Sequence, residues 1–438
     1  MCFNLYFSLH HVSLFRKLIN RILQVETKPV NTFLSPKTQL TFIFTKHKLV
    51  EISLLTYSRQ LWSQSFIYNE DNPRFPFQKG VDSMDITTEV RPGANRYVSG
   101  EGILQDLPSY FVGFKKISII TGEKSSEAFR KYYHKELHYP TYRYDGTSSH
   151  ENAVALAQKI QQAELIVAIG AGRVIDTAKM VAEELNAELL VIPTLISNCA
   201  PFTPIVAVYR PDRTFKAMGF MTRAPFLTIV DSKFLLATPK DYFVAGVGDT
   251  LAKWYEIEGI TRHMPEDEKS AYVSLGIACA KAIQELLLRD AIPAIEDLQN
   301  HKASPAFNRV TDAIIGLAGE TGGFAASFGR SAGAHAIHDG LSYLESTHEQ
   351  LHGMKVAYGI LVQLAHTKDI EEILTLRPFY EAAGLPMKLK ELNVLDTSKE
   401  ALTPVIDHAA SANETFNMVD PEISFDDIYQ AIQTVESL

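Results

Sequence analysis

Between residues 84 and 240, short apolar runs alternate with longer stretches whose apolar positions recur every three to four residues. Short runs of β-branched and aliphatic residues are typical of strands that are buried on both faces of a parallel sheet. The amphipathic stretches between them predict the crossover helices of such a sheet. The expected strands are 116–121, 165–169, 188–193 and 226–230, and the expected helices are 125–133, 150–162 and 176–185.

Beyond about residue 240 the strand pattern fades, and long helical patterns such as 270–288 and 355–366 take its place. A change from alternating strands and helices to helices alone indicates two domains of different class. We therefore expect an α/β, doubly wound (Rossmann-like) dinucleotide-binding domain over 84–240 and an all-α C-terminal domain over 241–438. The boundary between them is expected near Thr238-Pro239.

Residues 1–83 differ from the rest of the chain in composition. They contain no alanine and a single glycine, and they carry ten Lys and Arg against five Asp and Glu. Alanine and glycine supply helix surfaces and tight turns, so this stretch does not resemble the domains that follow it. We expect it to be an atypical leader outside the native protein, with translation starting at Met84. The alternative is an accessory or targeting segment.

Overall composition narrows the class of protein. The chain has 438 residues, of which 46% are hydrophobic and 21% charged, as in soluble globular proteins. Its formal net charge of −9 argues against nucleic acid and anionic membranes as partners. Three cysteines cannot build a disulfide framework, and no run approaches the ~18 apolar residues of a membrane helix. We expect a cytoplasmic protein that binds no nucleic acid and no membrane.

The first chemical motif is the glycine turn Gly170-Ala-Gly-Arg173, between an expected strand and an expected helix. Small residues there let the backbone approach a pyrophosphate, and the helix N-terminus offers free N–H groups and the positive end of its dipole. The turn lacks the third glycine of the dinucleotide fingerprint, and glycine also occurs in such turns for packing alone. Asp176 and Lys179 lie three residues apart on the following helix, so they either form an ion pair or line a cofactor cleft.

The second motif combines a carboxylate with histidines. Asp249 follows a glycine turn, and four histidines, His335, His338, His348 and His352, fall within eighteen residues. Two neutral imidazoles and one carboxylate that leave a coordination position open suit catalytic Zn²⁺ or Fe²⁺. The alternative is a surface cluster of histidines with neighbouring acids. We interpret His348 as the bystander of the four.

Together these motifs resemble the iron-containing alcohol dehydrogenase superfamily, specifically its glycerol-dehydrogenase-like branch. The resemblance extends from Tyr97-Val-Ser-Gly-Glu-Gly102 to the C-terminal helices, so it covers nearly all of 84–438 and none of 1–83. It depends on strings that occur in the order typical of the family, namely Gly170–Lys179, Val191–Thr194, Val230-Asp231, Gly246–Glu256, His335–Gly340 and His352–Gly359.

The resemblance implies roles for individual residues. Asp249, His335 and His352 would bind one divalent metal, Zn or Fe, and His338 would lie near the nicotinamide, which makes Asp249 and His338 the catalytic candidates. The metal would polarise a carbonyl and stabilise the developing alkoxide. The fold would align the nicotinamide C4 with the substrate carbon. His338 or a chain of waters would relay the proton.

One loop departs from the glycerol dehydrogenases. They usually carry Ser-Thr-Asp-Ala-Pro, whereas this chain has Ser197-Asn-Cys-Ala-Pro201, so that Cys199 stands at the aspartate position. Losing that carboxylate removes an acceptor for a polyol hydroxyl and a charge that would repel an anionic substrate. The sequence therefore looks more similar to the hydroxycarboxylate dehydrogenases of this branch. That resemblance implies interconversion of a small 2-oxo acid and its 2-hydroxy acid, with Asn198 and Cys199 near the substrate.

NADP is the expected cofactor, with NAD as the alternative. An acid at the end of the first strand would bind the ribose 2′-OH of NAD and repel a 2′-phosphate. Gly122 stands at that position, followed by Glu123, which a small change of register would bring there, and by Lys124. A plain strand-to-helix turn with Ser126 as N-cap is the simplest alternative. The candidates for cofactor binding are Gly122, Lys124, Gly170, Ala171, Gly172, Arg173, Asp176, Thr194 and Ser197.

Three other functions remain open. They are glycerol or vicinal diol oxidation to dihydroxyacetone, a dehydroquinate-synthase-like NAD-dependent lyase, and a catalytically inactive nucleotide-binding or regulatory protein. The alanine-rich string around His335 and His338 favours the dehydrogenases over the lyase, and the intact set of implied metal ligands disfavours an inactive protein. The expected partners are a small-molecule alcohol or oxo acid and further copies of this chain in a homo-oligomer.

Overall fold

The computed structural model describes residues 39–45, 48–55 and 90–438. The chain divides into two units, Met1–Pro73 and Arg74–Leu438. In the first unit, β1 (Gln39–Thr45) and β2 (Lys48–Leu55) form an antiparallel pair. Most of 1–83, and Met84 itself, lie outside the described residues, so the expectation of a leader that ends before Met84 stays a prediction.

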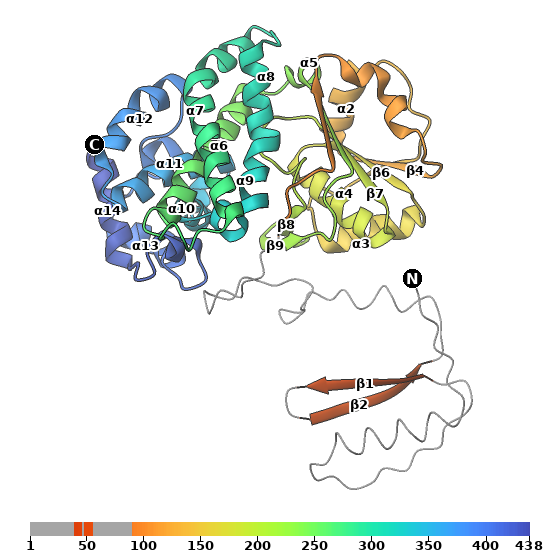
Figure 1. Ribbon diagram of the computed structural model, residues 1–438, viewed down its shortest axis with the longest axis horizontal. Helices are drawn as coiled ribbons and strands as arrows, with labels where there is room; N and C mark the ends of the chain where they lie inside the picture. Colours follow the sequence, from red (N-terminus) through yellow and green to blue (C-terminus); the bar gives the residue numbers. More distant parts are fainter. Residues whose placement is uncertain (1–38, 46–47, 56–89) are drawn as a thin grey trace. The chain divides into compact units, whose positions relative to one another are not determined.

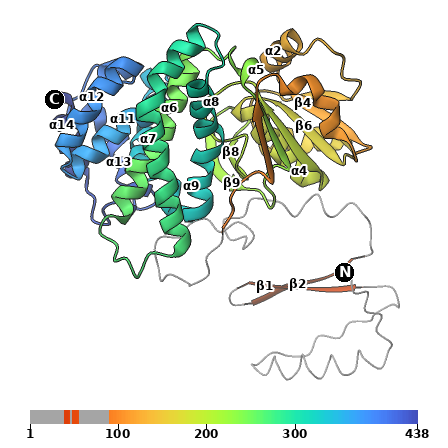
Figure 2. The ribbon, with the colours of Figure 1, turned by 45° about the horizontal axis from the view of Figure 1, so that its top comes forward.

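The second unit contains a six-stranded parallel sheet (Figures 1 and 2). Its strands lie in the order β3-β10-β7-β6-β4-β5, and every neighbouring pair is parallel. β4, β6 and β10 are buried at every position, which explains their continuous apolar runs. The predicted α/β class is confirmed. The strands are β3 (Arg96–Gly100), β4 (Ile117–Thr121), β5 (Thr141–Arg143), β6 (Leu165–Gly170), β7 (Glu188–Pro193) and β10 (Leu227–Asp231).

Within the second unit, the sequence patterns identified the four central strands of the sheet and missed four other strands. β3 and β5 are the two edges of the sheet, and neither is buried along its whole length. β8 (Ile205–Tyr209) and β9 (Phe215–Phe220) form a separate antiparallel hairpin with several exposed positions. Short, half-exposed strands lack the continuous apolar run from which the prediction was made.

The connections between the strands create a switch point in the sheet. After β4 the chain adds β5 on one side, and then adds β6 on the other side of β4. Open α/β sheets bind ligands outside the C-terminal ends of their strands at such a point. The ends of β4 and β6 are therefore the place for a nucleotide. The helices of this region are η2 (Ile103–Phe111), α2 (Glu123–Tyr132), α3 (His150–Ile160), α4 (Gly172–Leu185) and α5 (Ser232–Leu235).

After β10 the described chain forms helices and turns only, as the pattern predicted, and Figures 1 and 2 show these helices on one side of the sheet. Helices α6, α10 and α11 pack against one another at the centre of this region. The α-helices are α6 (Lys240–Thr261), α7 (Ala271–Gln299), α8 (Pro305–Asp312), α9 (Ala318–Ala325), α10 (Gly333–Leu341), α11 (His352–His366), α12 (Ile370–Ala383), α13 (Lys399–Ala409) and α14 (Phe425–Ser437). The short turns are η3 (Ala313–Leu317, π-helical), η4 (Ala326–Gly329), η5 (Glu345–Thr347), η6 (Leu389–Leu392) and η7 (Thr415–Met418).

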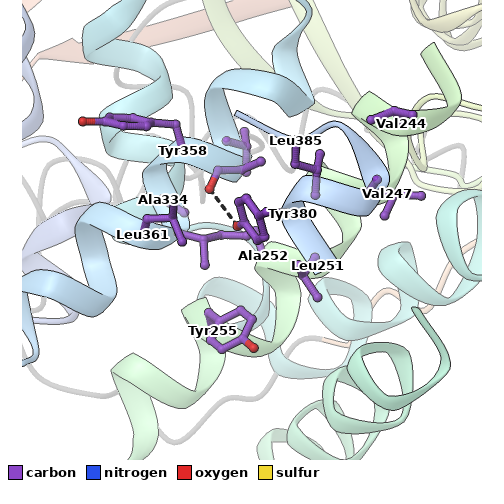
Figure 3. Packing of buried hydrophobic residues seen from close by; sticks show 14 of the residues in the cluster. Val244, Val247, Leu251, Ala252, Tyr255, Ala334, Tyr358, Leu361, Tyr380 and Leu385 are labelled. Atoms are coloured by element: carbon purple, nitrogen blue, oxygen red, sulfur yellow. Dashed lines mark hydrogen bonds between the residues drawn. The ribbon is translucent and has the colours of Figure 1, made fainter. Parts of the chain in front are cut away.

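A large cluster of buried apolar side chains fills the space between these helices. Figure 3 shows part of it, where Leu251 of α6, Leu361 of α11 and Tyr380 of α12 lie close together. The buried Tyr380 hydroxyl donates a hydrogen bond to the carbonyl oxygen of Ala357 at 2.9 Å, so its polar atom is satisfied inside the core. This core fixes the relative positions of α6 and α11.

Helix α7 meets the length and composition criteria of a membrane span, with 33% of its apolar window buried. Core helices of soluble proteins meet the same criteria, and α7 packs along α6, α8 and α9. The expectation that the protein has no membrane partner stays a prediction.

Candidate active site

Three side chains from three helices converge. Asp249 comes from the middle of α6, His335 from the first turn of α10, and His352 is the first residue of α11. The Nε2 atoms of His335 and His352 lie 3.3 Å and 3.2 Å from Oδ1 of Asp249, and one ligand atom from each residue lies within 4.8 Å of the others. Donors that share a tetrahedral metal at about 2.1 Å are separated by about 3.4 Å. The donor set therefore fits Zn²⁺ or Fe²⁺, and metal binding by these residues stays a prediction.

Close packing of α6 against α11 brings the predicted ligands together. A Cβ atom at Gly353 would lie 1.8 Å from the carbonyl oxygen of Ala245, and one at Gly248 would lie 2.6 Å from the carbonyl oxygen of Gly353. Gly248 directly precedes Asp249, and Gly353 directly follows His352. The glycines that let the two backbones touch are thus the sequence neighbours of the ligands.

His338 and His348 have different surroundings. Nε2 of His338 lies 2.9 Å from Nδ1 of His352, and its Nδ1 lies 2.8 Å from Oδ1 of Asp339. His338 therefore contacts a predicted ligand directly, and its catalytic role stays a prediction. His348 is exposed, its ring lies 3.2 Å from the carbonyl oxygen of Ser342, and it is outside the converging group, as interpreted from the sequence.

Two charged residues of α6 belong to the same cluster and were not predicted. Asp249, Lys253 and Glu256 occupy positions i, i+4 and i+7, so they share one face of the helix. Both carboxylate oxygens of Glu256 lie 2.9 Å from Nδ1 of His335. The Nζ atom of Lys253 lies 3.9 Å from Glu256 and donates to the carbonyl oxygen of Arg330. The signal in the sequence was this spacing of three charged residues within a helix that is otherwise largely apolar.

Burial and neighbouring charges shift the pKa values of this cluster. Burial opposes ionisation of Asp249, but the facing imidazoles of His352 and His335 hold its pKa well below the usual value. Burial also opposes charge on His335, but Glu256 raises its pKa to about 9. Burial and the neighbouring His352 lower the pKa of His338 to about 3. The Asp249 carboxylate is therefore held in the ionised form that a metal ion requires, and a metal bound at Nε2 of His335 would displace the proton that the neighbouring carboxylates favour there.

The glycine turn lies at the switch point of the sheet. Gly170 is the last residue of β6, and Gly172 is the first residue of α4. A Cβ atom at Gly170 would lie 2.4 Å from the Val174 side chain, so strand–helix packing requires this glycine. Among the described residues, no side chain caps the N-terminus of α4, whose N-cap residue is Ala171. Its first N–H groups fit a pyrophosphate.

Asp176 and Lys179 form a buried ion pair. Nζ of Lys179 lies 3.2 Å from Oδ1 of Asp176 and donates to the carbonyl oxygen of Ile205 at 2.5 Å. Oδ2 of Asp176 accepts a hydrogen bond from the N–H of Ala207 at 3.1 Å. These contacts join α4 to β8, which is the first of the two alternatives drawn from the sequence. A cofactor contact for Asp176 stays a prediction.

The end of β4 lies on the other side of the switch point. Gly122 is the N-cap residue of α2, and its N–H donates to the Ser125 hydroxyl at 2.9 Å. Helix α2 begins at Glu123, so the alternative in which Ser126 is the N-cap is wrong, because the hydroxyl that closes the turn belongs to Ser125. Lys124 is exposed in the first turn of α2.

Two more of the predicted nucleotide-binding residues lie along the same edge of the sheet. The Arg173 guanidinium donates to the carbonyl oxygen of Gly146, in the loop after β5, at 3.3 Å. The N–H of Thr194, directly after β7, donates to the carbonyl oxygen of Gly170 at 3.0 Å. The C-terminal ends of β4, β6 and β7 therefore present these candidates together.

The loop after β7 lies against α6. A Cβ atom at Gly246 would lie 3.2 Å from the Cα atom of Ser197, and Oδ1 of Asn198 accepts a hydrogen bond from a backbone N–H two residues later at 3.0 Å. Burial raises the pKa of the Cys199 thiol to about 11, against the opposing charge of Lys253. Cys199 is thus a neutral thiol on which the charges of Lys253 and Asp249, both on α6, act.

The chain thus combines a sheet whose switch point suits a nucleotide with a carboxylate and two imidazoles that suit a metal ion. This combination is typical of metal-dependent enzymes that use a nucleotide cofactor. Residues 94–232 match the family profile described as iron-containing alcohol dehydrogenase. The chain is 31% identical to a glycerol dehydrogenase from Thermotoga maritima over 80% of this chain and 97% of that protein. It is 35% identical to hydroxycarboxylate dehydrogenase A from Escherichia coli K12 over 62% of this chain and 75% of that protein.

Solved structures agree with these relatives. A probable glycerol dehydrogenase from Sinorhizobium meliloti superimposes with a TM-score of 0.71 at 26% identity, covering 80% of this chain and 98% of that one. This chain belongs to the iron-containing alcohol dehydrogenase family. It is an oxidoreductase that acts on CH–OH groups, in a family that binds NAD(P) and a divalent metal.

Proposed function

We propose that the protein interconverts a small 2-oxo acid and its 2-hydroxy acid, using a nicotinamide nucleotide and one divalent metal held by Asp249, His335 and His352. The observation that carries the proposal is the buried Lys253 side chain, which lies 3.9 Å from its nearest carboxylate and whose charge acts on Cys199. Cys199 is a neutral thiol whose pKa responds to the charges of both Lys253 and Asp249. A buried ammonium beside a neutral thiol favours a substrate that carries its own carboxylate.

Lys253 has N–H donors available to bind a substrate carboxylate. Its side chain is only 9% exposed, and its nearest carboxylate, 3.9 Å away, is that of Glu256. Glu256 is already bonded to His335 and to the N–H of Ala332, so it neutralises the ammonium only in part. An ammonium has three N–H donors, and among the described residues Lys253 bonds to one carbonyl oxygen, that of Arg330.

In the proposed reaction, residues of this chain would bind the cofactor, orient the substrate and carry the proton. The metal, when bound, would supply Lewis-acid polarisation of the substrate carbonyl. The uncapped N-terminus of α4 would hold the pyrophosphate, and Lys253 would orient the substrate carboxylate. His338 lies between His352 and Asp339, whose side chain is 43% exposed, so a proton passed through His338 would reach solvent there.

A substrate screen with matched variants tests the proposal. The purified protein is assayed at defined Zn²⁺, Fe²⁺ and Mn²⁺ with NADPH or NADH, using 2-oxobutanoate and 2-oxoglutarate against the uncharged dihydroxyacetone. We expect Lys253→Met to lower kcat/KM for 2-oxobutanoate by about 10- to 100-fold, the value of one charge-assisted hydrogen bond, and to leave dihydroxyacetone nearly unchanged. Equal losses for both substrates would reject a carboxylate-binding role.

Glycerol is a second candidate substrate, and the relatives support it at least as well. The Thermotoga maritima protein and one from Escherichia coli O6:H1 are both named glycerol dehydrogenase. Cys199→Asp adds the carboxylate that can accept a polyol hydroxyl, so it should raise glycerol oxidation relative to 2-hydroxybutanoate oxidation. Faster wild-type turnover of glycerol than of 2-hydroxybutanoate would favour this candidate.

Further properties belong to the same proposal. We propose NADP over NAD because Gly122, and not an acid, directly follows β4 and Lys124 is exposed in the first turn of α2, although the exposed Glu123 lies between them. We also propose a cytoplasmic homo-oligomer. Kinetics with both nucleotides, and the mass of the native particle measured by light scattering, test these points.

A further inference from the structure

We propose that Glu256 is a positioning residue that fixes both the imidazole ring of His335 and the N-terminus of α10, so that Nε2 of His335 faces Asp249. The inference concerns metal binding and not the choice of substrate. It rests on the metal centre of the proposed function.

The first observation is the bonding of the His335 ring. Its Nδ1 atom lies 2.9 Å from each carboxylate oxygen of Glu256, and its Nε2 atom lies 3.3 Å from Oδ1 of Asp249. A carboxylate at Nδ1 accepts a hydrogen bond from the N–H of that nitrogen, which leaves the lone pair of the neutral ring on Nε2. The contact therefore selects the tautomer and the ring orientation that a metal ligand needs.

The second observation is the position of Glu256 at the start of α10. Oε1 of Glu256 also accepts hydrogen bonds from the N–H groups of Ala332 at 2.7 Å and His335 at 3.0 Å. Ala332 is the N-cap residue of α10 and has no side-chain acceptor of its own. The carboxylate thus caps α10 from a different helix, where it also meets the positive end of the helix dipole.

Burial makes this arrangement specific. The Glu256 side chain is 3% exposed, and an unpaired carboxylate at that depth would be costly. It is satisfied by one imidazole, two backbone N–H groups and the nearby ammonium of Lys253. Asp249 and Glu256 lie two turns apart on α6. The same helix therefore fixes the position of one predicted ligand, Asp249, and of the carboxylate that orients a second one, His335.

Two substitutions and one control separate positioning from capping. Glu256→Met removes the acceptor but keeps the volume, and Glu256→Gln keeps one oxygen that can accept from Nδ1. Glu258→Gln is the control, because Glu258 pairs with Arg262, four residues on along α6. The dissociation constant for Zn²⁺ is measured by chelator competition, and the thermal unfolding of each metal-free protein is measured separately.

We expect Glu256→Met to weaken Zn²⁺ binding by about 10- to 100-fold, Glu256→Gln to weaken it less, and Glu258→Gln to match the wild type. A residue that only caps α10 would lower the stability of the metal-free protein and leave the Zn²⁺ dissociation constant unchanged. That outcome would overturn the proposal.

Two further measurements keep the result decisive. If Glu256→Met does not fold, the Co²⁺ absorption spectrum and Zn²⁺ affinity of Glu256→Gln are compared with those of Glu258→Gln. A change confined to Glu256→Gln supports positioning, and identical values reject it. His352→Ala distinguishes the two levels of proposal. If His352→Ala binds Zn²⁺ as tightly as the wild type, the proposed metal centre itself is rejected. If His352→Ala loses Zn²⁺ affinity and the Glu256 variants do not, only the proposed role of Glu256 is rejected.

Discussion

The predicted metal centre and the predicted nucleotide edge are built from different kinds of atoms. At the metal centre, Asp249, His335 and His352 are held by side-chain contacts of 2.9–3.3 Å that continue into Glu256 and His338. At the nucleotide edge, the ends of β4, β6 and β7 present mainly backbone groups, namely a glycine turn and an uncapped helix N-terminus. The first region is specified residue by residue, and the second is specified by the order of strands in the sheet.

This difference predicts where substitutions act. A side-chain network fails when one member is removed, since its partners remain buried without their bonds. A backbone site tolerates side-chain changes unless they alter the path of the chain. Large effects should therefore occur in the helical region, and smaller ones along the edge of the sheet.

The largest expected effect is the loss of one predicted ligand. His352→Ala should release the metal and lower kcat by at least about a thousandfold, because Lewis-acid stabilisation contributes several kcal/mol to the transition state. Metal content by mass spectrometry and steady-state kinetics measure both effects. His348→Ala is the matched control, because His348 is exposed and lies four residues away. Normal turnover and full metal content in His352→Ala would contradict its assignment as a ligand.

The same contrast explains which site residues could be predicted. His335 and His338 were identified because a bulky imidazole among alanine and glycine has little packing reason to be there. Glu256 and Lys253 were missed, since charged residues at helical spacing are most often solvated. Only the packing of α10 against α6 shows that both are buried. The predicted metal ligands can be recognised from residue type and local sequence. The residues that hold those ligands in place can be recognised only from tertiary contacts.

The second prediction tests the buried Asp176–Lys179 ion pair of α4, whose two side chains also hydrogen-bond to β8. Lys179→Met leaves the Asp176 carboxylate without its ammonium and should lower the free energy of unfolding by about 3 kcal/mol. The KM for the nucleotide should stay unchanged if the pair only joins α4 to β8. Denaturant unfolding and kinetics are compared with Lys159→Met, an exposed site on α3. A higher KM with normal stability would instead place the pair in the cofactor site.

The third prediction tests the close approach of α6 and α11. Gly353→Ala puts a methyl group where only 1.8 Å separates it from the carbonyl oxygen of Ala245, so the helices must separate. Overpacking of this kind should cost about 1–3 kcal/mol of stability and weaken metal binding by displacing His352. Gly316→Ala is the control, because a Cβ atom there would be 3.6 Å from its nearest neighbour, Tyr97. Unchanged metal affinity in Gly353→Ala would show that the ligands do not depend on this contact.

The strands, like the site residues, differ in how well they could be predicted from the sequence. The central strands β4, β6, β7 and β10 were found from their apolar runs, because burial on both faces leaves a strong signal in composition. The hairpin β8–β9 left no such signal, although β8 accepts a hydrogen bond from Lys179 and donates one to Asp176. The spacing of those two residues could not distinguish an ion pair from a cofactor contact, since the strand that completes the pair was unknown.

The smallest expected effect concerns nucleotide choice at the end of β4. Lys124 is exposed, so its attraction to a ribose 2′-phosphate is screened by solvent and should contribute about 0.5–1 kcal/mol. Lys124→Glu should therefore raise the KM for NADPH about two- to fivefold and leave the KM for NADH almost unchanged. Lys131→Glu, at the other end of α2, controls for a general change in charge. The difference should shrink in high salt, and an effect of equal size on NADH would assign Lys124 to the shared pyrophosphate instead of the 2′-phosphate.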